Sequence, residues 1–295
     1  MRAPGNNPLF RPPAEADSLI LQVDRGCPYN RCTFCGMYKG MTYRRLAIEE
    51  TAALIAREAR HAGPDVRRVF LADGDVMRRP FDELAAILDQ LAQAFPALAR
   101  VNVYATGRGI AEKSDAQLRD LRARRLHTLY LGLESGDDEV LRQVRKGEDA
   151  AGMAAAGRRA QECGLRISVM ILLGLGGAAR TSGHADATAR ALNAMQPRLL
   201  AALRVVPVPG TELFEDARAG RFRELTERQV VAELRRIVAG LELHNTVFRA
   251  DHSSNVVPLE ARLPRDKTRL LAELDALLSS DVLDARTPGA RPMWL

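Results

Sequence analysis

The chain alternates short runs of β-branched and other apolar residues with longer segments in which apolar residues recur at helical spacing. Six short runs predict strands, at residues 18–23, 67–74, 100–107, 126–136, 165–177 and 199–210. Amphipathic segments between them predict helices, at 47–63, 81–95, 114–125 and 184–196, with further helical residues ending near Cys163. This pattern indicates six successive βα units.

Strands that alternate with helices pair in parallel, because only a long crossover returns the chain to the same edge of a sheet. We therefore expect an α/β fold, either an open doubly wound sheet or a full or partial barrel. It should form one domain, with a lead-in at 1–17, a core at 18–212 and an extension at 213–295 that packs on the core. Within the extension, the pattern predicts helices at 227–241 and 266–280 and an extended segment at 245–259.

Polar or glycine-rich signatures stand where four of the predicted strands end, at 72–75 (ADGD), 132–136 (GLESG), 174–177 (GLGG) and 207–210 (PVPG). In both candidate architectures, the carboxyl ends of parallel strands form the face that binds ligands. A loop rich in cysteine follows the first strand, so we expect it on the same face.

The composition is ordinary for an enzyme-sized globular protein, with 46% hydrophobic and 27% charged residues in 295. No apolar run approaches the roughly 18 residues of a membrane span, and the first residues lack the apolar stretch of a signal peptide. We therefore expect a cytoplasmic protein without a membrane segment. Reducing conditions there disfavour disulfides, so the cysteines are expected to bind metal or to act in catalysis.

The net charge of +6 raises the possibility of a nucleic-acid partner. However, 39 arginines against four lysines, with many alanines, is typical of a GC-rich bacterial genome. The arginines are spread along the chain, often beside acids on predicted helix faces, which indicates solvated surfaces. The charge pattern therefore argues against nucleic acid, although a localised basic stripe would favour it.

Three of the four cysteines, Cys27, Cys32 and Cys35, form a C-x4-C-x2-C cluster. Structural zinc needs four ligands, usually as two close pairs, and Cys163 lies far away on a helical pattern that favours a small buried side chain. A plant-type [2Fe-2S] ferredoxin uses this spacing, but six βα units predict a different architecture. A nucleophilic cysteine would not require two thiol neighbours.

The remaining possibility is a [4Fe-4S] cluster with three thiolate ligands, which leaves one iron open to a small molecule. Here the sequence resembles the radical S-adenosylmethionine (SAM) enzymes, from about residue 18 to 212. The resemblance rests first on the three cysteines and on the aromatic Phe34 directly before the last one. The usual spacing in that family is C-x3-C-x2-C. We expect the extra residue, in the stretch of Tyr29, Asn30 and Arg31, to lengthen the loop without adding a ligand.

The resemblance implies a partial (β/α)6 barrel in which the open iron chelates SAM. It also implies that Asp73, Gly74 and Asp75 receive the SAM amino group, although the common motif ends in Glu and an Asp-Gly turn is the plainer interpretation. Segment 132–147, GLESGDDEVLRQVRKG, resembles one shared by the elongator catalytic subunit, methylthiotransferases and coproporphyrinogen dehydrogenases. That likeness implicates Glu134 and Ser135 in binding SAM.

Two further stretches resemble the adenine side of the family's site. ILLGLGG resembles the fifth-strand glycine motif and implicates Leu173 and Gly174, and RVVPVPGTELF matches the sixth-strand region with Val206 and Pro207. Glycines at such turns also serve helix packing alone. For the substrate side, Tyr104 and His252 are the candidate catalytic residues. Further candidates near the mouth of the barrel are Asn102, Arg204 and Asn255.

The resemblance implies reductive cleavage of SAM to a 5'-deoxyadenosyl radical that abstracts hydrogen from a substrate. An external donor of the flavodoxin or ferredoxin type would supply the electron. Four cysteines leave no second fully ligated cluster, and a first strand near residue 18 leaves no room for a preceding cobalamin domain, so we expect a small organic substrate. An RNA-modifying enzyme of the same family and an iron–sulfur electron carrier that never cleaves SAM are the alternatives.

Overall fold

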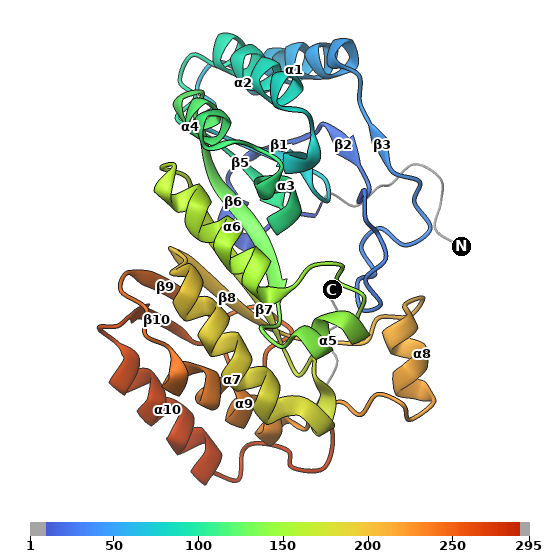
Figure 1. The fold of residues 1–295 in the computed structure, drawn as a ribbon, viewed down its shortest axis with the longest axis vertical. Helices are drawn as coiled ribbons and strands as arrows, with labels where there is room; N and C mark the ends of the chain where they lie inside the picture. Colours follow the sequence, from blue (N-terminus) through green and yellow to red (C-terminus); the bar gives the residue numbers. More distant parts are fainter. Residues whose placement is uncertain (1–9, 290–295) are drawn as a thin grey trace. The chain divides into compact units, whose positions relative to one another are not determined.

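A computed structural model describes residues 10–289 (Figure 1). The chain forms two compact units. Unit 1 comprises the described residues up to Asn30, Gly40–Tyr130 and Ala160–Leu165, and unit 2 comprises Arg31–Lys39, Leu131–Arg159 and the residues from Arg166 onward. The cysteine loop is thereby divided, with Cys27 in unit 1 and with Cys32 and Cys35 in unit 2.

Unit 1 contains the first βα units. Its elements are η1 (Pro13–Glu15), β1 (Leu19–Gln22), β2 (Asp24–Arg25), β3 (Arg44–Arg45), α1 (Ile48–Ala62), β4 (Arg68–Ala72), η2 (Val76–Arg78), α2 (Phe81–Ala94), β5 (Arg100–Ala105), α3 (Gly107–Ala111) and α4 (Asp115–Ala123). Strand β6 (Leu126–Glu134) begins in unit 1 and ends in unit 2. Helix α6 (Ala150–Glu162) runs the other way, from unit 2 into unit 1.

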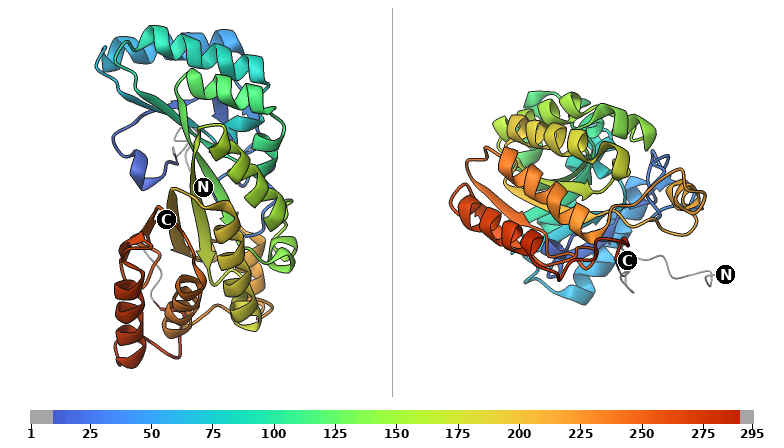
Figure 2. Two further views of the ribbon diagram at one scale, coloured as in Figure 1. Left: turned by 60° about the vertical axis from the view of Figure 1, so that its left-hand side comes forward. Right: turned by 90° about the horizontal axis from the view of Figure 1, so that it is seen from below.

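Unit 2 contains the later βα units and the C-terminal extension. Its remaining elements are α5 (Asp138–Gln143), β7 (Arg166–Leu173), α7 (Gly177–Met195), β8 (Leu199–Arg204), α8 (Glu212–Arg218), α9 (Glu227–Gly240), β9 (Thr246–Arg249), β10 (Glu260–Leu263) and α10 (Lys267–Ser279). Helix α9 lies between α7 and α10 and packs against both (Figure 2).

The strands are hydrogen-bonded in the order β1-β4-β5-β6-β7-β8-β9-β10, and β1 and β10 at the two ends do not pair with each other, so the sheet is not closed. Within this sheet, pairs β1–β4, β4–β5, β7–β8 and β8–β9 are parallel and β9–β10 is antiparallel. Strands β2 and β3 form a separate antiparallel pair. The predicted α/β class and parallel pairing are confirmed. The predicted extended segment supplies β9, which adds to the sheet beside β8.

Burial on both faces explains why the parallel strands read as continuous apolar runs. In unit 1, four consecutive residues of β4 (Val69–Ala72) are fully buried. Helices α1 and α2 of the same unit pack together (Figure 1). In unit 2, β7 buries Ile167, Val169 and Ile171. Among residues 10–289, none of the helices combines the length and apolar character that crossing a bilayer requires.

Candidate functional site

A buried carboxylate stands at the carboxyl ends of β1 and β4 in unit 1. Asp73 directly follows β4 and is 1% exposed. Its Oδ2 accepts hydrogen bonds from Gln22 Nε2 (2.7 Å) and from the backbone amide of Gly26 (3.0 Å). Its Oδ1 is buried and has no hydrogen-bond partner among residues 10–289. Burial raises the pKa of Asp73, and its hydrogen bonds to Gln22 and Gly26 lower the pKa in part. The free oxygen is a ready acceptor for a ligand.

The next residue, Gly74, lies directly against the cysteine loop. A methyl group on Gly74 would lie 2.7 Å from Cα of Cys27 and 2.8 Å from the carbonyl oxygen of Gly26. Only glycine permits this approach, because real side chains do not come that close to backbone. The Cys27 sulfur in turn accepts from the backbone amide of Asn30 at 3.5 Å. The predicted group of Cys27, Asp73 and Gly74 is thus assembled within unit 1.

Asp75 has a different role in the structure from Asp73. Its Oδ1 accepts from the backbone amide of Thr106 (3.2 Å) and its Oδ2 from the Thr106 hydroxyl (2.5 Å). Thr106 is also the N-cap of α3, since its hydroxyl accepts from the amide of Gly109. Asp75 therefore fixes the loop that follows β5, and both of its carboxylate oxygens are engaged with protein.

The two β5 residues predicted for the substrate side, Asn102 and Tyr104, also differ in how far the protein itself engages their polar atoms. Asn102 is buried, with Nδ2 donating to Glu15 (2.8 Å) and Oδ1 accepting from the Thr128 amide (3.0 Å). Tyr104 packs edge-on against Phe70, with ring centroids 5.0 Å apart. Burial raises the pKa of Tyr104, as do the nearby charges of Asp73 and Glu15. Tyr104 is therefore an O–H donor close to the Asp73 carboxylate, whereas Asn102 is fully used within the protein.

In unit 2, the segment with Cys32 and Cys35 is anchored on both sides. The amide of Thr33 donates to the carbonyl of Val144 (3.0 Å), and the carbonyl of Thr33 accepts from the amide of Leu213 (3.0 Å). Phe34 packs against an apolar cluster of Val140, Val144, Leu175, Val205 and Leu213. The aromatic before the last cysteine thus seats the loop on the core of unit 2.

An ion pair lies beside this loop. Glu134 ends β6 with a left-handed φ of +62°, and Lys146 Nζ lies 3.1 Å from its Oε1. The carboxylate folds back over Gly132, where a methyl group would lie 2.2 Å from Oε1. Burial alone would lower the pKa of Lys146, but the charges of Glu134 and Cys32 raise it above its usual value. Lys146 thus stays charged between a strand-end carboxylate and a cysteine of the cluster.

Two more predicted residues end neighbouring strands in unit 2. Ser135 follows β6 and is fully buried, and its Oγ lies 2.8 Å from Nδ1 of His184. Gly174 follows β7 with φ +79°, and its amide donates to Glu233 Oε1 (2.6 Å). Leu173 is 1% exposed, so its side chain belongs to the core. A cavity of about 10 Å³ adjoins Leu173 and Gly174, which is room for a single water.

The residues predicted after β8 lie where the chain turns from this strand toward α8. Val206 is half-buried and Pro207 is buried. Arg204 donates from Nη1 to the carbonyl of Pro288 (2.7 Å), and Asn255 donates to the carbonyl of Ala202 (2.8 Å).

His252 belongs to a tight loop after β9. Its Nδ1 accepts from the backbone amide of Ser254 (3.1 Å), so the proton of the neutral ring resides on Nε2. Burial lowers the pKa of His252, which keeps the ring neutral. The structure therefore leaves its Nε2–H as a possible donor.

No group of three or more His, Cys, Asp or Glu side chains near enough to hold a metal ion occurs within residues 10–289. Because Cys27 and the pair Cys32 and Cys35 belong to different units, the joint ligand set stays a prediction. None of the four cysteines forms a disulfide. Cys27, Cys32 and Cys35 are partly exposed, whereas Cys163 is buried, as its helical pattern predicted.

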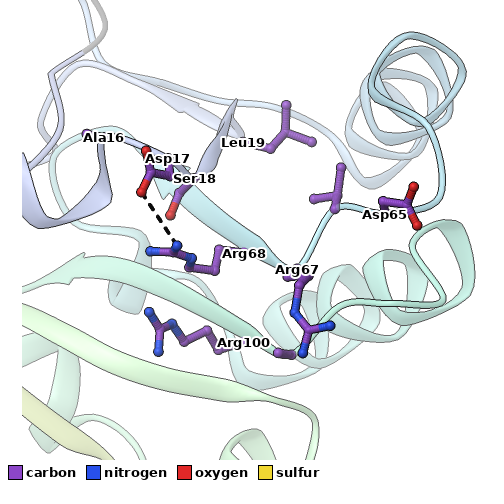
Figure 3. Close-up of a pocket in the computed structure, with 10 residues that line it drawn as sticks. Ala16, Asp17, Ser18, Leu19, Asp65, Arg67, Arg68 and Arg100 are labelled. Atoms are coloured by element: carbon purple, nitrogen blue, oxygen red, sulfur yellow. Dashed lines mark ion pairs between the residues drawn. The ribbon is translucent and has the colours of Figure 1, made fainter.

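The large hollow in unit 1 lies away from these residues. It measures about 820 Å³ and is lined at the amino ends of β1, β4 and β5 (Figure 3). Arg67, Arg68 and Arg100 are drawn there, and Arg68 pairs with Asp17 at 3.5 Å. The predicted residues of unit 1 stand at the opposite, carboxyl ends of the same strands, so this hollow is not the predicted site.

Sequence reasoning missed Lys146, Gln22 and the pair His184 and Glu233. Lys146 is one of only four lysines in an arginine-rich chain, and it lies within the matched segment 132–147. The scarcity of lysine in the sequence was the signal that could have identified Lys146. Gln22, His184 and Glu233 offered none, because their roles depend on contacts with residues 49 to 59 positions away, namely Asp73, Ser135 and Gly174.

The chain is similar to known proteins in both sequence and fold. The model of the Radical SAM superfamily matches residues 21–178, and no curated protein matches the chain. Among solved structures, methylornithine synthase has a TM-score of 0.52 at 18% identity, with 88% of this chain and 81% of that chain covered. Coproporphyrinogen III oxidase from Escherichia coli has a TM-score of 0.54 at 17% identity, covering 89% and 52%.

The hydrogenase maturase HydG from Carboxydothermus hydrogenoformans has a TM-score of 0.51 at 21% identity, with 87% and 56% covered. The chain thus spans about half the length of these last two proteins. At such identities the likeness establishes the fold. The prediction of a partial (β/α)6 barrel with an unclosed sheet is confirmed.

Proposed function

This chain belongs to the radical SAM superfamily, whose enzymes use a [4Fe-4S] cluster and SAM, and on that premise we propose that it binds the cluster through Cys27, Cys32 and Cys35. When bound, the cluster and SAM would supply a 5'-deoxyadenosyl radical that abstracts a hydrogen atom from a substrate. We assign this chemistry to residues 18–212, with 213–295 as an extension packed on them.

The cysteine residues fit a cluster in their chemistry and exposure. Three partly exposed cysteine thiols outside any disulfide are the donor set of a cluster with one open iron. The amide of Asn30 already donates to the Cys27 sulfur, and hydrogen bonds to ligand sulfurs help to set the reduction potential. Lys146 adds a positive charge beside Cys32, which favours the thiolate that binds iron.

The single observation that carries the SAM assignment is the unpartnered Oδ1 of Asp73. A buried carboxylate oxygen without a donor costs about 1–3 kcal/mol, and a ligand ammonium would remove that cost. The oxygen belongs to a carboxylate that also holds Gly26, the neighbour of Cys27. We therefore assign Asp73 to the SAM amino group, with Gly74 giving the close approach and Asp75 supporting the adjacent loop.

We assign the remaining contacts with SAM to residues of unit 2. Glu134 would contact the ribose or amino-acid end, with the fully buried Ser135 beside it. The backbone at Leu173 and Gly174 would contact the adenine, because the Leu173 side chain is already buried in the core. Val206 and Pro207 would complete the adenine side after β8. Lys146, next to Glu134, is placed to attract a SAM carboxylate.

For the substrate we propose a small organic molecule, with Tyr104 and His252 as the residues that contact it. Tyr104 can donate its hydroxyl near Asp73, and His252 can donate through Nε2–H. An external flavodoxin or ferredoxin would supply the electron, and the protein would act in the cytoplasm. The distribution of the arginines does not favour nucleic acid as the substrate.

Anaerobic reconstitution with iron and sulfide tests this function. Wild-type protein should bind about four irons per chain and release 5'-deoxyadenosine and methionine from SAM when dithionite is added. Cys32→Ala should lose the iron, whereas Cys163→Ala should keep it. Asp73→Asn should keep the iron and bind SAM more weakly. A stable cluster that never cleaves SAM would contradict the proposal and favour an electron carrier.

A further inference from the structure

A set of buried polar side chains in unit 2 lies behind the strand ends of β6 and β7. His184 of α7 and Glu233 of α9 have fully buried side chains. Glu233 Oε1 accepts from the Gly174 amide at 2.6 Å, and its Oε2 accepts from the hydroxyl of Thr181. On the other side, His184 Nδ1 lies 2.8 Å from Ser135 Oγ. The two helices therefore hold both strand ends at once.

The burial of these two ionisable side chains in the protein interior costs free energy. Burial raises the pKa of Glu233 to about 7 and lowers the pKa of His184 to about 4, so both neutral forms are favoured by their surroundings. His184 Nε2 is 3.6 Å from Glu233 Oε1 and has no hydrogen-bond partner among the described residues. Apolar side chains would pack these helices at lower cost, so the network has a purpose beyond packing.

The network adds to the hydrogen bonds that the backbone of Ser135 and Gly174 already makes with nearby residues. Gly174 has a left-handed φ of +79°, so its amide is aimed by a turn and needs an acceptor. After Ser135, the chain runs so close to α7 that a methyl group on Gly136 would lie 2.2 Å from the carbonyl oxygen of Ala187. The amide of Gly136 donates to Thr188 Oγ1 at 2.9 Å. Each strand end is thus tied to α7 or α9 by a specific polar contact.

We propose that Glu233 and His184 are positioning residues for SAM: through the Gly174 amide and the Ser135 hydroxyl they hold the ends of β7 and β6 in the geometry that binds the nucleoside. This assignment rests on the proposed SAM site at Ser135 and Gly174. Neither residue touches SAM, because both side chains are fully enclosed. Their effect is to preorganise the site, so that binding does not have to order the strand ends.

A purely structural role predicts a different result from a positioning role. Arg236 and Asp186 form an exposed ion pair between the same two helices, with Nε and Oδ1 2.6 Å apart. If the network only clamped α7 to α9, loss of either contact would act through stability alone. If it positions the strand ends, only the network variants should change the affinity for SAM.

The experiment measures the dissociation constant of SAM by equilibrium binding to cluster-loaded protein. Glu233→Ala should weaken binding about tenfold, since it leaves the Gly174 amide without its acceptor. Glu233→Gln keeps an acceptor oxygen and should restore the affinity to within about twofold of wild type. Arg236→Ala is the matched control and should bind SAM as wild type does. At saturating SAM, the cleavage rate of each variant should stay near that of wild type.

Hydrogen exchange in the SAM-free protein gives a second measurement. The Gly174 amide should exchange faster in Glu233→Ala and at the wild-type rate in Glu233→Gln. If Glu233→Ala does not fold, Thr181→Val and His184→Gln replace it, and each should weaken SAM binding by a smaller factor. Unchanged SAM affinity in the folded network variants, or equal weakening in Arg236→Ala, overturns the inference. Wild-type protein that binds no SAM would instead overturn the proposed function.

Discussion

Lys146 Nζ lies 3.1 Å from Oε1 of Glu134, and both side chains are nearly buried, at 11% and 13% exposure. The charge of Cys32 also acts on Lys146, so the ion pair at the end of β6 interacts electrostatically with the cysteine loop. The segment predicted to bind SAM and the motif predicted to bind the cluster therefore share one ammonium group in unit 2.

We expect Lys146→Gln to lower the reduction potential of the reconstituted cluster by tens of millivolts. A positive charge near a ligand sulfur stabilises the electron-rich reduced state of the cluster. Loss of the charge removes this stabilisation and makes the cluster harder to reduce. Potentiometric titration of the cluster measures the shift. Arg145→Gln is the control, since Arg145 is exposed and pairs with Glu212. A potential that is equally displaced in both variants would contradict a specific role for Lys146.

Gly74→Ala should displace the cysteine loop from β4. The added methyl group would meet Cα of Cys27 at 2.7 Å and the Gly26 carbonyl at 2.8 Å, and backbone cannot rotate away as a flexible side chain can. We expect the iron content after reconstitution to fall below about half of the wild-type value and the melting temperature to be lower than that of wild type.

The control for this substitution is Gly183→Ala in α7. There the nearest atom to the new methyl group is an oxygen of Asp137 at 3.6 Å, an ordinary contact, and alanine favours a helix over glycine. This variant should keep its iron and its melting temperature. Normal iron content in Gly74→Ala would show that the loop does not depend on the close approach at Gly74.

A buried ion pair in unit 1 should dominate the effect of charge on stability. Arg79 and Asp24 are completely enclosed, with Nη2 and Oδ1 2.8 Å apart, and Arg79 also donates to the carbonyls of Val23 and Leu46. Arg79→Met should lower the free energy of unfolding by about 3–5 kcal/mol, because it leaves Asp24 buried without its partner.

The matched comparison is the exposed pair of Arg235 and Asp275 on α9 and α10, at 2.9 Å. Arg235→Met should cost at most about 1 kcal/mol, since solvent screens that pair. Denaturant unfolding of both variants measures the difference. Similar losses in the two variants would mean that burial does not set the strength of these pairs.

The strand pattern could be predicted from sequence because both faces of the parallel sheet are covered. Strand β4 is buried at four of its five residues and β7 at five of eight, so each is visible as an apolar run. Strands β2 and β3 are two residues each, and β3 is fully exposed. Such short polar pairs leave no periodic signal. Strand β10 alternates exposed and buried residues, but its four residues are too few to stand out in the sequence.

The site could be predicted only where chemistry is local in the sequence. The cysteine spacing and the ADGD segment are visible as short motifs, and the structure brings Gly74 against Cys27. The different roles of Asp73 and Asp75 were not visible, because they depend on Gln22, the last residue of β1, and on Thr106, the residue after β5. Asn102 looked free on its strand face, but η1 supplies Glu15 as its partner.

The stability of the folded protein should depend on pH through the titration of Glu233. The substitution Glu233→Gln should remove this dependence. Burial raises the pKa of Glu233 from 4.5 to about 7, so the folded protein holds a proton that the unfolded chain has already lost between these values. Stability from this group is therefore complete below pH ~4.5 and is lost as the pH rises through about 7. The loss amounts to about 3 kcal/mol.

Comparison of wild type with Glu233→Gln separates the titration of Glu233 from that of its neighbour His184. The pKa of His184 is lowered to about 4, which makes stability rise with pH between 4 and 6.5. That contribution is present in wild type and in Glu233→Gln alike, so it cancels in the difference between them. The free energy of unfolding of Glu233→Gln minus that of wild type should therefore increase by about 3 kcal/mol from pH 4 to pH 8. A difference that stays constant over this range would show that Glu233 has the same pKa in the folded protein as in the unfolded chain.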